Sequence, residues 1–241
     1  MELKPIRTDG QPVQPGYGYE PAQDIASAEQ GQKVLRNTYL LLAVTMVPTI
    51  IGAFIGMATS SIITASPIIS MVVMFVAVIG LQVGIAANRN SGVGVALLLL
   101  MTGLLGWFLG PLLNHVLALR NGVQLVSYAA AGTGIIFFAM SAIATTTKRD
   151  FSFMGKFLFV GMIALIVAMF ANMFLQIPAL ALTISTLVIV VFSGFLLYDL
   201  NRIVRGGETN YIMATTGVYM SLFNIFVHLL SILGIVGGDR D

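Results

Sequence analysis

Long apolar stretches separated by short polar breaks fill the chain from residue 38 onward. Each stretch has about 20 residues or slightly more, the length that an α-helix needs to cross a lipid bilayer. The breaks contain residues that favour turns, such as "NRNSG" and "RGGETN". The pattern predicts an all-α, polytopic membrane protein, a bundle of seven transmembrane helices. We place the spans at residues 38–58, 66–87, 92–113, 124–145, 155–176, 179–200 and 212–236.

The composition also indicates a membrane environment. Hydrophobic residues make up 57% of the 241 residues and charged residues only 9%, whereas soluble domains carry about 25% charged residues. A soluble fold of this length could not bury so much apolar surface, because its surface is large relative to its volume. The net charge of +2, without a basic block, gives no indication of nucleic-acid binding. We therefore expect the lipid bilayer to surround the chain.

The sequence contains no recognisable catalytic or metal-binding motif. There is no cysteine, which excludes disulfides and thiolate metal sites. The two histidines, His115 and His228, lie far apart in the sequence and outside any HExxH motif, and no GxSxG motif occurs. We therefore expect neither an enzyme nor a bound cofactor or metal ion.

The first 32 residues differ from everything that follows. They are rich in Pro, Gly and Gln, with Pro5, Pro12, Pro15 and Pro21 spread along them. Such a segment buries too little apolar surface to offset the entropy of ordering it, so we expect it to be disordered. The predicted organisation is a disordered tail at 1–32 and a transmembrane domain at 33–241.

The positive charges predict how the helices are oriented in the membrane. With seven spans the two termini lie on opposite sides, and cytoplasmic loops of membrane proteins carry an excess of Lys and Arg. Only Arg120 and Arg240 fall on the side of the C-terminus. We therefore expect a cytoplasmic N-terminus and a C-terminus on the opposite side. From residue 33 onward, the eight cations on the side of the N-terminus are Lys33, Arg36, Arg89, Lys148, Arg149, Lys156, Arg202 and Arg205.

Glycines four residues apart occur once in each of the first three spans, a spacing that lets another helix backbone come close. Such pairs can form a dimer interface or pack helices within one bundle. In a protein with many spans we favour packing within the bundle. The pairs are Gly52 and Gly56, Gly80 and Gly84, and Gly106 and Gly110.

Polar residues follow one face of the last span. Ser221, Asn224, His228 and Ser231 stand at positions i, i+3, i+7 and i+10. An unpaired polar group in hydrocarbon costs several kcal/mol, so this face should contact protein or water. We therefore expect the seventh span to be central or to line a cavity. Hydrogen bonding between helices and a functional pathway both explain the stripe.

An acidic residue, Asp199, lies at the end of the sixth span, followed by Arg202 and Arg205. One interpretation is a salt bridge at the membrane surface, which contributes little to stability. The other is a gate that senses pH. Folding the chain about the "RGGE" loop puts Asp199 level with Thr216, and Ser221 lies roughly 7 Å deeper at 1.5 Å rise per residue.

The segment "YDLNRIVRGGETNYIMATTGVYMSLFNIFVHLLSILG" at 198–234 resembles the C-terminal signature of the Bax inhibitor-1 family of membrane proteins. This resemblance implies a seven-helix bundle with the seventh helix at its centre. Some members are described as pH-sensitive calcium leak channels gated by two aspartates. The first corresponds to Asp199, whereas the second falls at Ser221. A carboxylate and a serine cannot share a proton as two carboxylates do, which weakens the calcium-channel interpretation.

Further stretches, "KVLRNTY", "LGPLLN" and "ANMFLQIPAL", resemble bacterial inner-membrane members of this family. That resemblance implies an inner-membrane protein that binds and restrains the membrane-anchored AAA protease FtsH and is itself a slow substrate. In an inner membrane, the orientation predicted from the charges places the C-terminus in the periplasm. The N-terminal tail would be the loose end that such a protease needs. Our leading hypothesis is FtsH modulation. The alternative is a pH-sensitive cation or calcium leak channel, and a structural membrane protein remains a third possibility.

Overall fold

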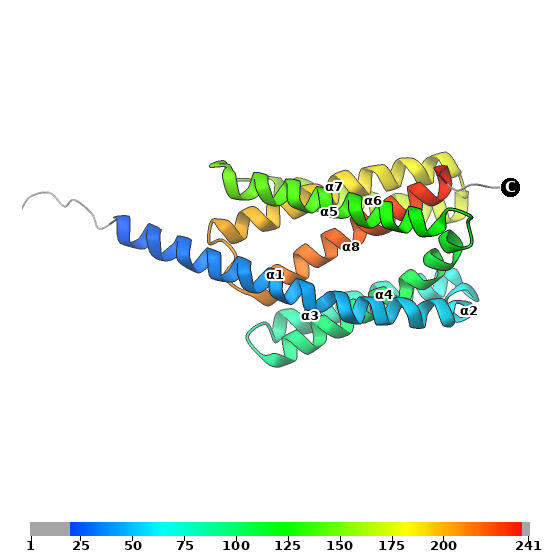
Figure 1. Cartoon of the computed structure of the whole chain (residues 1–241), viewed down its shortest axis with the longest axis horizontal. Helices are drawn as coiled ribbons and strands as arrows, with labels where there is room; N and C mark the ends of the chain where they lie inside the picture. The colour runs from blue at the N-terminus through cyan, green and yellow to red at the C-terminus, as the bar shows by residue number, and fades with distance from the viewer. Residues whose placement is uncertain (1–19, 238–241) are drawn as a thin grey trace, which may run out of the picture.

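The computed structural model describes residues 20–237, with side chains from residue 29 onward, and all regular structure in this part is helical. Seven helices are long and apolar enough to cross a membrane, and the short α2 lies in the connection between α1 and α3 (Figure 1). The predicted all-α seven-span fold is confirmed, with α8 as the seventh span. The helices are α1 Glu20–Ala58, α2 Ser60–Thr64, α3 Pro67–Ala87, α4 Gly92–Leu117, α5 Gly122–Thr146, α6 Met154–Leu175, α7 Pro178–Val204 and α8 Tyr211–Val236.

The first helix begins well before the expected boundary. We predicted disorder up to residue 32, but α1 is already helical from Glu20, so the prediction is wrong for residues 20–32. Ala, Gln and Glu, which favour helices, dominate this stretch, and Pro21 stands in the first turn, where proline is tolerated. Residues 1–19 lie outside the described part of the chain.

The last helix, α8, is the centre of the bundle. It packs against α1, α3, α4, α5 and α7, and Figure 1 shows it crossing the middle of the molecule. No residue from Ile212 to Ile235 is exposed. The expected central seventh helix is therefore confirmed, and the polar stripe on it faces protein.

The most extensive contact between helices joins α1 and α4. A Cβ atom added at Gly52 would collide with the backbone of Gly103, and one at Gly56 with the backbone of Trp107. On the α4 side, a Cβ atom at Gly106 or Gly110 would collide with the backbone of α1. These two glycine pairs pack helices within the bundle, as predicted. We call this contact the α1–α4 seam.

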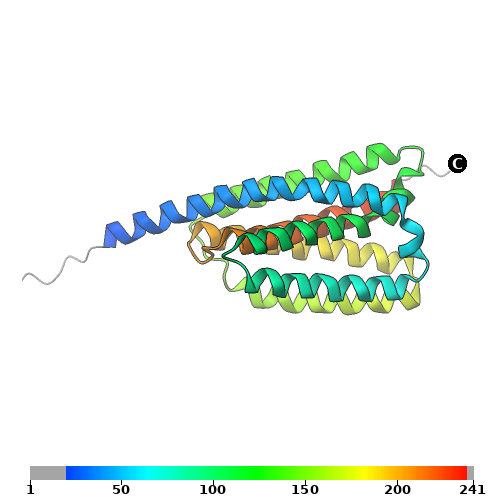
Figure 2. The same ribbon diagram turned by 90° about the horizontal axis from the view of Figure 1, so that it is seen from below.

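The third glycine pair does not behave in the same way. A Cβ atom at Gly80 would meet no atom within 4 Å, and one at Gly84 would meet only a side-chain atom of Leu97. Both glycines lie on α3, at the edge of the bundle. Figure 2 shows α3 beside α6 at this edge, and the rings of Phe75 and Phe170 lie 5.6 Å apart there. The packing predicted for this pair is therefore wrong at Gly80.

Candidate functional site

The turn between α7 and α8 is shaped by one glycine and one asparagine. Gly206 has φ of 72°, a left-handed conformation that other residues rarely adopt. Asn210 precedes α8, and its side-chain oxygen accepts hydrogen bonds from the backbone N–H groups of Ile212 and Met213. Asn210 is therefore the N-cap of α8. The chain therefore reverses sharply and starts α8 beside the end of α7.

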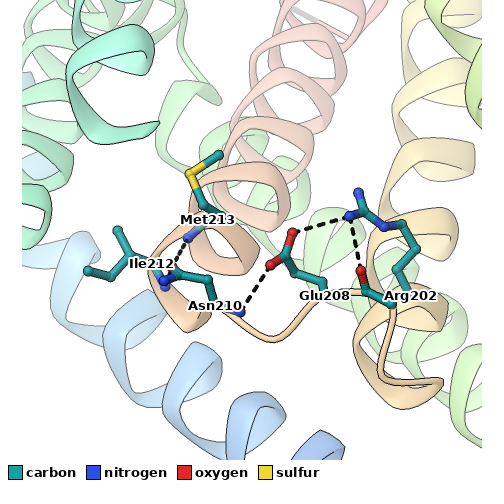
Figure 3. Close-up of polar contacts among 6 residues, drawn as sticks. Arg202, Glu208, Asn210, Ile212 and Met213 are labelled. Atoms are coloured by element: carbon teal, nitrogen blue, oxygen red, sulfur yellow. Dashed lines mark hydrogen bonds and ion pairs between the residues drawn. The ribbon is translucent and has the colours of Figure 1, made fainter. Parts of the chain in front are cut away.

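Arg202 binds within this turn (Figure 3). Its Nη2 atom lies 3.2 Å from Oε2 of Glu208 and donates a hydrogen bond to the Gly207 carbonyl. Oε1 of Glu208 accepts a hydrogen bond from the Asn210 backbone N–H at 3.0 Å. The Asn210 amide in turn donates to the carbonyl of Arg89 and to Asn90 Oδ1, both at 2.8 Å. A continuous polar network thus joins α7, its turn and the α3–α4 turn.

A second set of contacts fastens the α5–α6 connection to the end of α7. Asn201 is 1% exposed, accepts a hydrogen bond from the Phe151 N–H and donates one to the Arg149 carbonyl. Arg205 donates to the Lys148 carbonyl. Three turns of the chain therefore meet at the C-terminal end of α7.

Asp150 in the same connection is fully outside the spans. Its carboxylate accepts hydrogen bonds from the Ser152 hydroxyl at 2.6 Å and from the Ser152 N–H at 2.8 Å. These hydrogen bonds, with a smaller contribution from the positive charge of Arg205, lower the pKa of Asp150 below its ordinary value. The loop therefore carries a negative charge beside the cations that surround it.

Asp199 lies one turn deeper, in a pocket of about 330 Å³ between α3, α6, α7 and α8. Oδ2 of Asp199 lies 2.6 Å from the place that a Cβ atom on Gly217 would occupy. Gly217 therefore leaves the room that the carboxylate fills. Ser221, Thr216 and Gln82 also line the pocket, so carboxylate, hydroxyl and amide groups face one space.

The expected partners of Asp199 are different in the structure. Among the described residues, Asp199 has neither a hydrogen bond nor an ion pair, because Arg202 turns to Glu208 and Arg205 to the α5–α6 connection. Of the two interpretations of Asp199, the salt bridge to a neighbouring arginine is therefore not formed. The cause is the Gly206 turn, which brings Glu208 back over Arg202 and offers it a closer carboxylate.

The polar stripe of α8 makes local contacts. Asn224 donates to the Met220 carbonyl one turn earlier. His228 Nδ1 lies 3.1 Å from Ser185 Oγ on α7, and Ser231 has no hydrogen bond within the described residues. Ser221 is 2% exposed. The structure therefore brings Ser221 together with Asp199, and leaves Asn224, His228 and Ser231 deeper along α8.

Several residues of the site escaped the sequence reasoning. Asn201 carried a signal, because it is a second polar residue two positions after Asp199 in an apolar run. Glu208 belongs to the quoted "RGGETN" turn, but only the geometry of the turn shows that it forms an ion pair with Arg202. Neither Gln82 nor Gly217 could be recognised from its neighbours in the sequence. Gln82 reaches the pocket from a distant helix, and Gly217 contributes by having no side chain, which leaves room for the Asp199 carboxylate. Within the described residues no group of three or more His, Asp and Glu could hold a metal ion.

Comparison with known proteins places this fold in a family. A family model described as "Inhibitor of apoptosis-promoting Bax1" matches residues 31–238, which includes all seven spans and the polar turn. The chain belongs to the Bax inhibitor-1 family. The resemblance seen in the 198–234 segment is thereby confirmed, and the chain is a multi-pass membrane protein of this family.

Relatives in three bacteria are similar over nearly the whole chain. An uncharacterized membrane protein of Vibrio cholerae is 44% identical over 207 residues, 86% of this chain and 91% of the relative. The Escherichia coli protein named "Modulator of FtsH protease YccA" is 40% identical over 218 residues, 90% of this chain and 97% of the relative. An uncharacterized protein of Pseudomonas aeruginosa is 37% identical over 221 residues, 92% and 97% of the two chains.

Proposed function

We propose that this protein resides in the bacterial inner membrane and modulates the FtsH protease. The observation that carries the proposal is the similarity to the Escherichia coli protein named a modulator of FtsH protease, which extends over 97% of that relative. The similarity also covers 90% of this chain. A function that depends on the intact bundle fits such coverage better than one that depends on a short motif.

The α1–α4 seam suggests how the bundle would restrain a protease that pulls on its substrates. A pull on the N-terminus acts first on α1, which contacts the backbone of α4 at Gly52 and Gly56. Two hydrogen bonds further fix α1, one between Thr49 Oγ1 and the Tyr219 hydroxyl at 2.8 Å and one from the Asn114 amide to the Met57 carbonyl. Extraction must separate all of these contacts together, so the protease stays occupied for longer.

This mechanism needs the N-terminus on the side of the protease's ATPase, which we propose to be the cytoplasm. From residue 33 onward, eight cations lie on the side of the N-terminus and two on the other, as the positive-inside rule requires. A reporter active only in the periplasm should work when fused after Asp241 and should be silent when inserted between Arg205 and Glu208. The reverse pattern would contradict the orientation and the mechanism.

The direct test of the proposed partner is co-purification from membranes solubilised in mild detergent. FtsH should come with the tagged protein, and adding the purified protein to FtsH in proteoliposomes should slow the degradation of a second membrane substrate. An unrelated seven-span protein at equal concentration is the control. Unchanged degradation, with the two proteins present in one vesicle, would reject the proposal.

A cation leak is the second candidate function. It is favoured by the Asp199 carboxylate, which faces the pocket with Ser221 and Gln82 and has no ion-pair partner among the described residues. Ile225, one turn beyond Ser221, is fully buried, so a path along α8 would require helices to move. We expect calcium flux into proteoliposomes to depend little on pH between about pH 6 and pH 8, and to depend more on it in Ser221→Asp. A steep native response that Asp199→Asn abolishes would favour the channel over FtsH modulation.

A further inference from the structure

Two apolar cavities lie side by side between α1 and α5, with α8 as their floor. The first, of about 410 Å³, is lined by residues such as Tyr39, Gly134 and Phe138. The second, of about 530 Å³, extends to Met57 on α1 and Val126 on α5. Met46, Thr133 and Leu222 line both cavities. The two therefore form one continuous groove, which we call the α1–α5 groove.

The groove runs through most of the thickness of a membrane. From Tyr39 to Met57, α1 rises about 27 Å at 1.5 Å per residue, close to the roughly 30 Å of a bilayer's hydrocarbon core. Its walls are aliphatic and aromatic, with only the hydroxyls of Thr49, Thr133 and Tyr219 along the deep part. Hydrocarbon is the solvent that such a surface meets in a bilayer.

The dimensions favour an acyl chain over a protein helix as the occupant. A helix about 11 Å across and 27 Å long occupies on the order of 2,500 Å³, several times the volume of either cavity. Volumes between about 300 and 1,000 Å³ are typical of sites for small ligands. A flexible hydrocarbon chain fits such a narrow, irregular space.

Polar and cationic groups gather where the groove reaches the N-terminal end of the bundle. The Tyr39 hydroxyl and Ser141 Oγ lie 2.7 Å apart and bridge α1 to α5. Arg36 is one turn before Tyr39 and exposed, and Lys148 follows α5 and is exposed as well. Charged groups from three elements meet there, since Gly31 packs against the end of α7 and Arg205 binds the Lys148 carbonyl.

This rim has an excess of positive charge. We define the rim as the exposed charged residues of the α1 turns before Tyr39, of the start of the α5–α6 connection and of the end of α7. These are five cations and two anions: Lys33, Arg36, Lys148, Arg149 and Arg205, and Glu29 and Asp150. Arg202 is not among the cations, because it is paired with Glu208. Basic rims between transmembrane helices bind the phosphates of anionic lipid head groups. The positive charge of the rim matches the phosphate of an anionic lipid, and the apolar groove below it matches the acyl chain of the same molecule.

We propose that the α1–α5 groove binds an anionic phospholipid, with an acyl chain between α1 and α5 and the phosphate at the cationic rim. This site is independent of the Asp199 pocket, which lies on the α3 and α6 side of α8. A bound lipid fills the space between α1 and α5, which otherwise touch at Tyr39 with Ser141 and with Phe137. The lipid thereby completes the packing of α1.

The test is native mass spectrometry of the purified full chain, delipidated and then mixed with phosphatidylglycerol or phosphatidylcholine. Gly134→Phe adds a ring to the lining of the groove, and its Cβ atom has room because a Cβ atom at Gly134 meets nothing within 4 Å. Gly80→Phe is the matched control, since Gly80 is equally open but lies on α3. We expect Gly134→Phe to weaken phosphatidylglycerol binding about tenfold or more, and Gly80→Phe to leave it unchanged. Equal binding by wild type and Gly134→Phe would overturn the site.

The charge of the rim is tested separately. Arg36→Gln and Lys148→Gln should each weaken phosphatidylglycerol binding about fivefold, the effect of removing one cation at a membrane surface, with no effect on phosphatidylcholine. Arg89→Gln removes an exposed cation from the α3–α4 turn at the same end of the bundle and should change neither. Equal affinity of the wild type for both lipids would overturn the anionic part of the proposal.

A second copy of the chain is the alternative occupant. The chain contains no cysteine, so Gly134→Cys introduces a unique thiol into the groove. In lipid vesicles this variant should stay monomeric under oxidation, because the acyl chain separates the thiol from other proteins. Efficient formation of a disulfide-linked dimer would show that a second copy covers the groove and would overturn the lipid proposal.

Discussion

The α1–α4 seam and the α7–α8 turn hold the same bundle together by different means. At the seam, Gly56 and Gly106 bring two backbones into contact, and shape alone decides whether the helices fit. At the turn, buried Asn201 and the Arg202–Glu208 pair connect three loops through hydrogen bonds and charge. The seam should therefore respond to added volume, and the turn to lost hydrogen bonds and to pH.

This difference matters for function, because the two regions serve different proposals. The seam lies where a pull on the N-terminus would act. The turn surrounds Asp199, the residue on which a cation pathway depends. A substitution that alters only one of these regions should therefore affect only one of the two proposed functions, FtsH modulation or ion conduction.

The largest expected effect comes from adding volume to the seam. In Gly56→Leu the new side chain meets the Trp107 backbone, so it should lower the free energy of unfolding by about 3 kcal/mol. Thermal unfolding in detergent measures the change. The matched control is Gly80→Leu, which adds the same atoms in open space and should stay within about 0.5 kcal/mol of wild type. Equal losses in both variants would mean that the seam is not specially packed.

The loss of the buried amide at the turn should come next. Asn201→Leu leaves the Phe151 N–H and the Arg149 carbonyl without their partner, which should cost about 1–3 kcal/mol. The α5–α6 connection should also become more accessible to limited proteolysis. A variant with native stability and an uncleaved loop would show that this amide does not fasten the connection.

Removing the cap of α8 should have a smaller effect. Asn210→Ala removes two hydrogen bonds to the first turn of α8 and two exposed ones to Arg89 and Asn90. The loss of the cap should destabilise the fold by about 1 kcal/mol. Thr209→Ala changes the neighbouring residue, which is exposed and makes no side-chain hydrogen bond among the described residues. It should therefore be neutral in the same thermal assay. A larger loss of stability in Thr209→Ala than in Asn210→Ala would instead identify Thr209 as the capping residue.

The smallest effect concerns the exposed Asp150. Hydrogen bonds from Ser152 lower its pKa in the folded protein, so the carboxylate stabilises the fold above about pH 4, its unfolded pKa, and this contribution is lost as the pH falls further. The melting temperature of wild type should therefore fall slightly more between about pH 5 and pH 3 than that of Asp150→Asn. Parallel curves would show that these hydrogen bonds do not affect stability.

Much of the fold followed from local patterns. The seven spans are visible as runs of apolar residues, and the central position of α8 follows from the stripe at Ser221, Asn224, His228 and Ser231, because polar groups avoid lipid. The "RGGETN" turn also carried its own signal in Gly206 and Asn210. These features depend on neighbours in the sequence, so the sequence alone is sufficient to predict them.

Features that depend on distant neighbours were not predictable. Three helices carry glycines four residues apart, yet only those of α1 and α4 face each other, and nothing in the spacing tells them from Gly80 on α3. Asp199 lies near two arginines in the sequence, but the turn brings Glu208 close to Arg202, and these two form the ion pair. The helical start of α1 at Glu20 was missed because the prolines before it suggested disorder for the whole segment.

The most direct test of the account is the rate at which purified FtsH degrades the reconstituted protein in proteoliposomes with ATP. We predict slow degradation of wild type and of Gly80→Ala, and faster degradation of Gly106→Ala, whose new Cβ atom collides with the Thr49 backbone in the seam. Faster degradation should be accompanied by weaker inhibition of a second substrate. Equal rates for Gly106→Ala and wild type, with FtsH bound to both, would contradict the claim that the seam resists extraction.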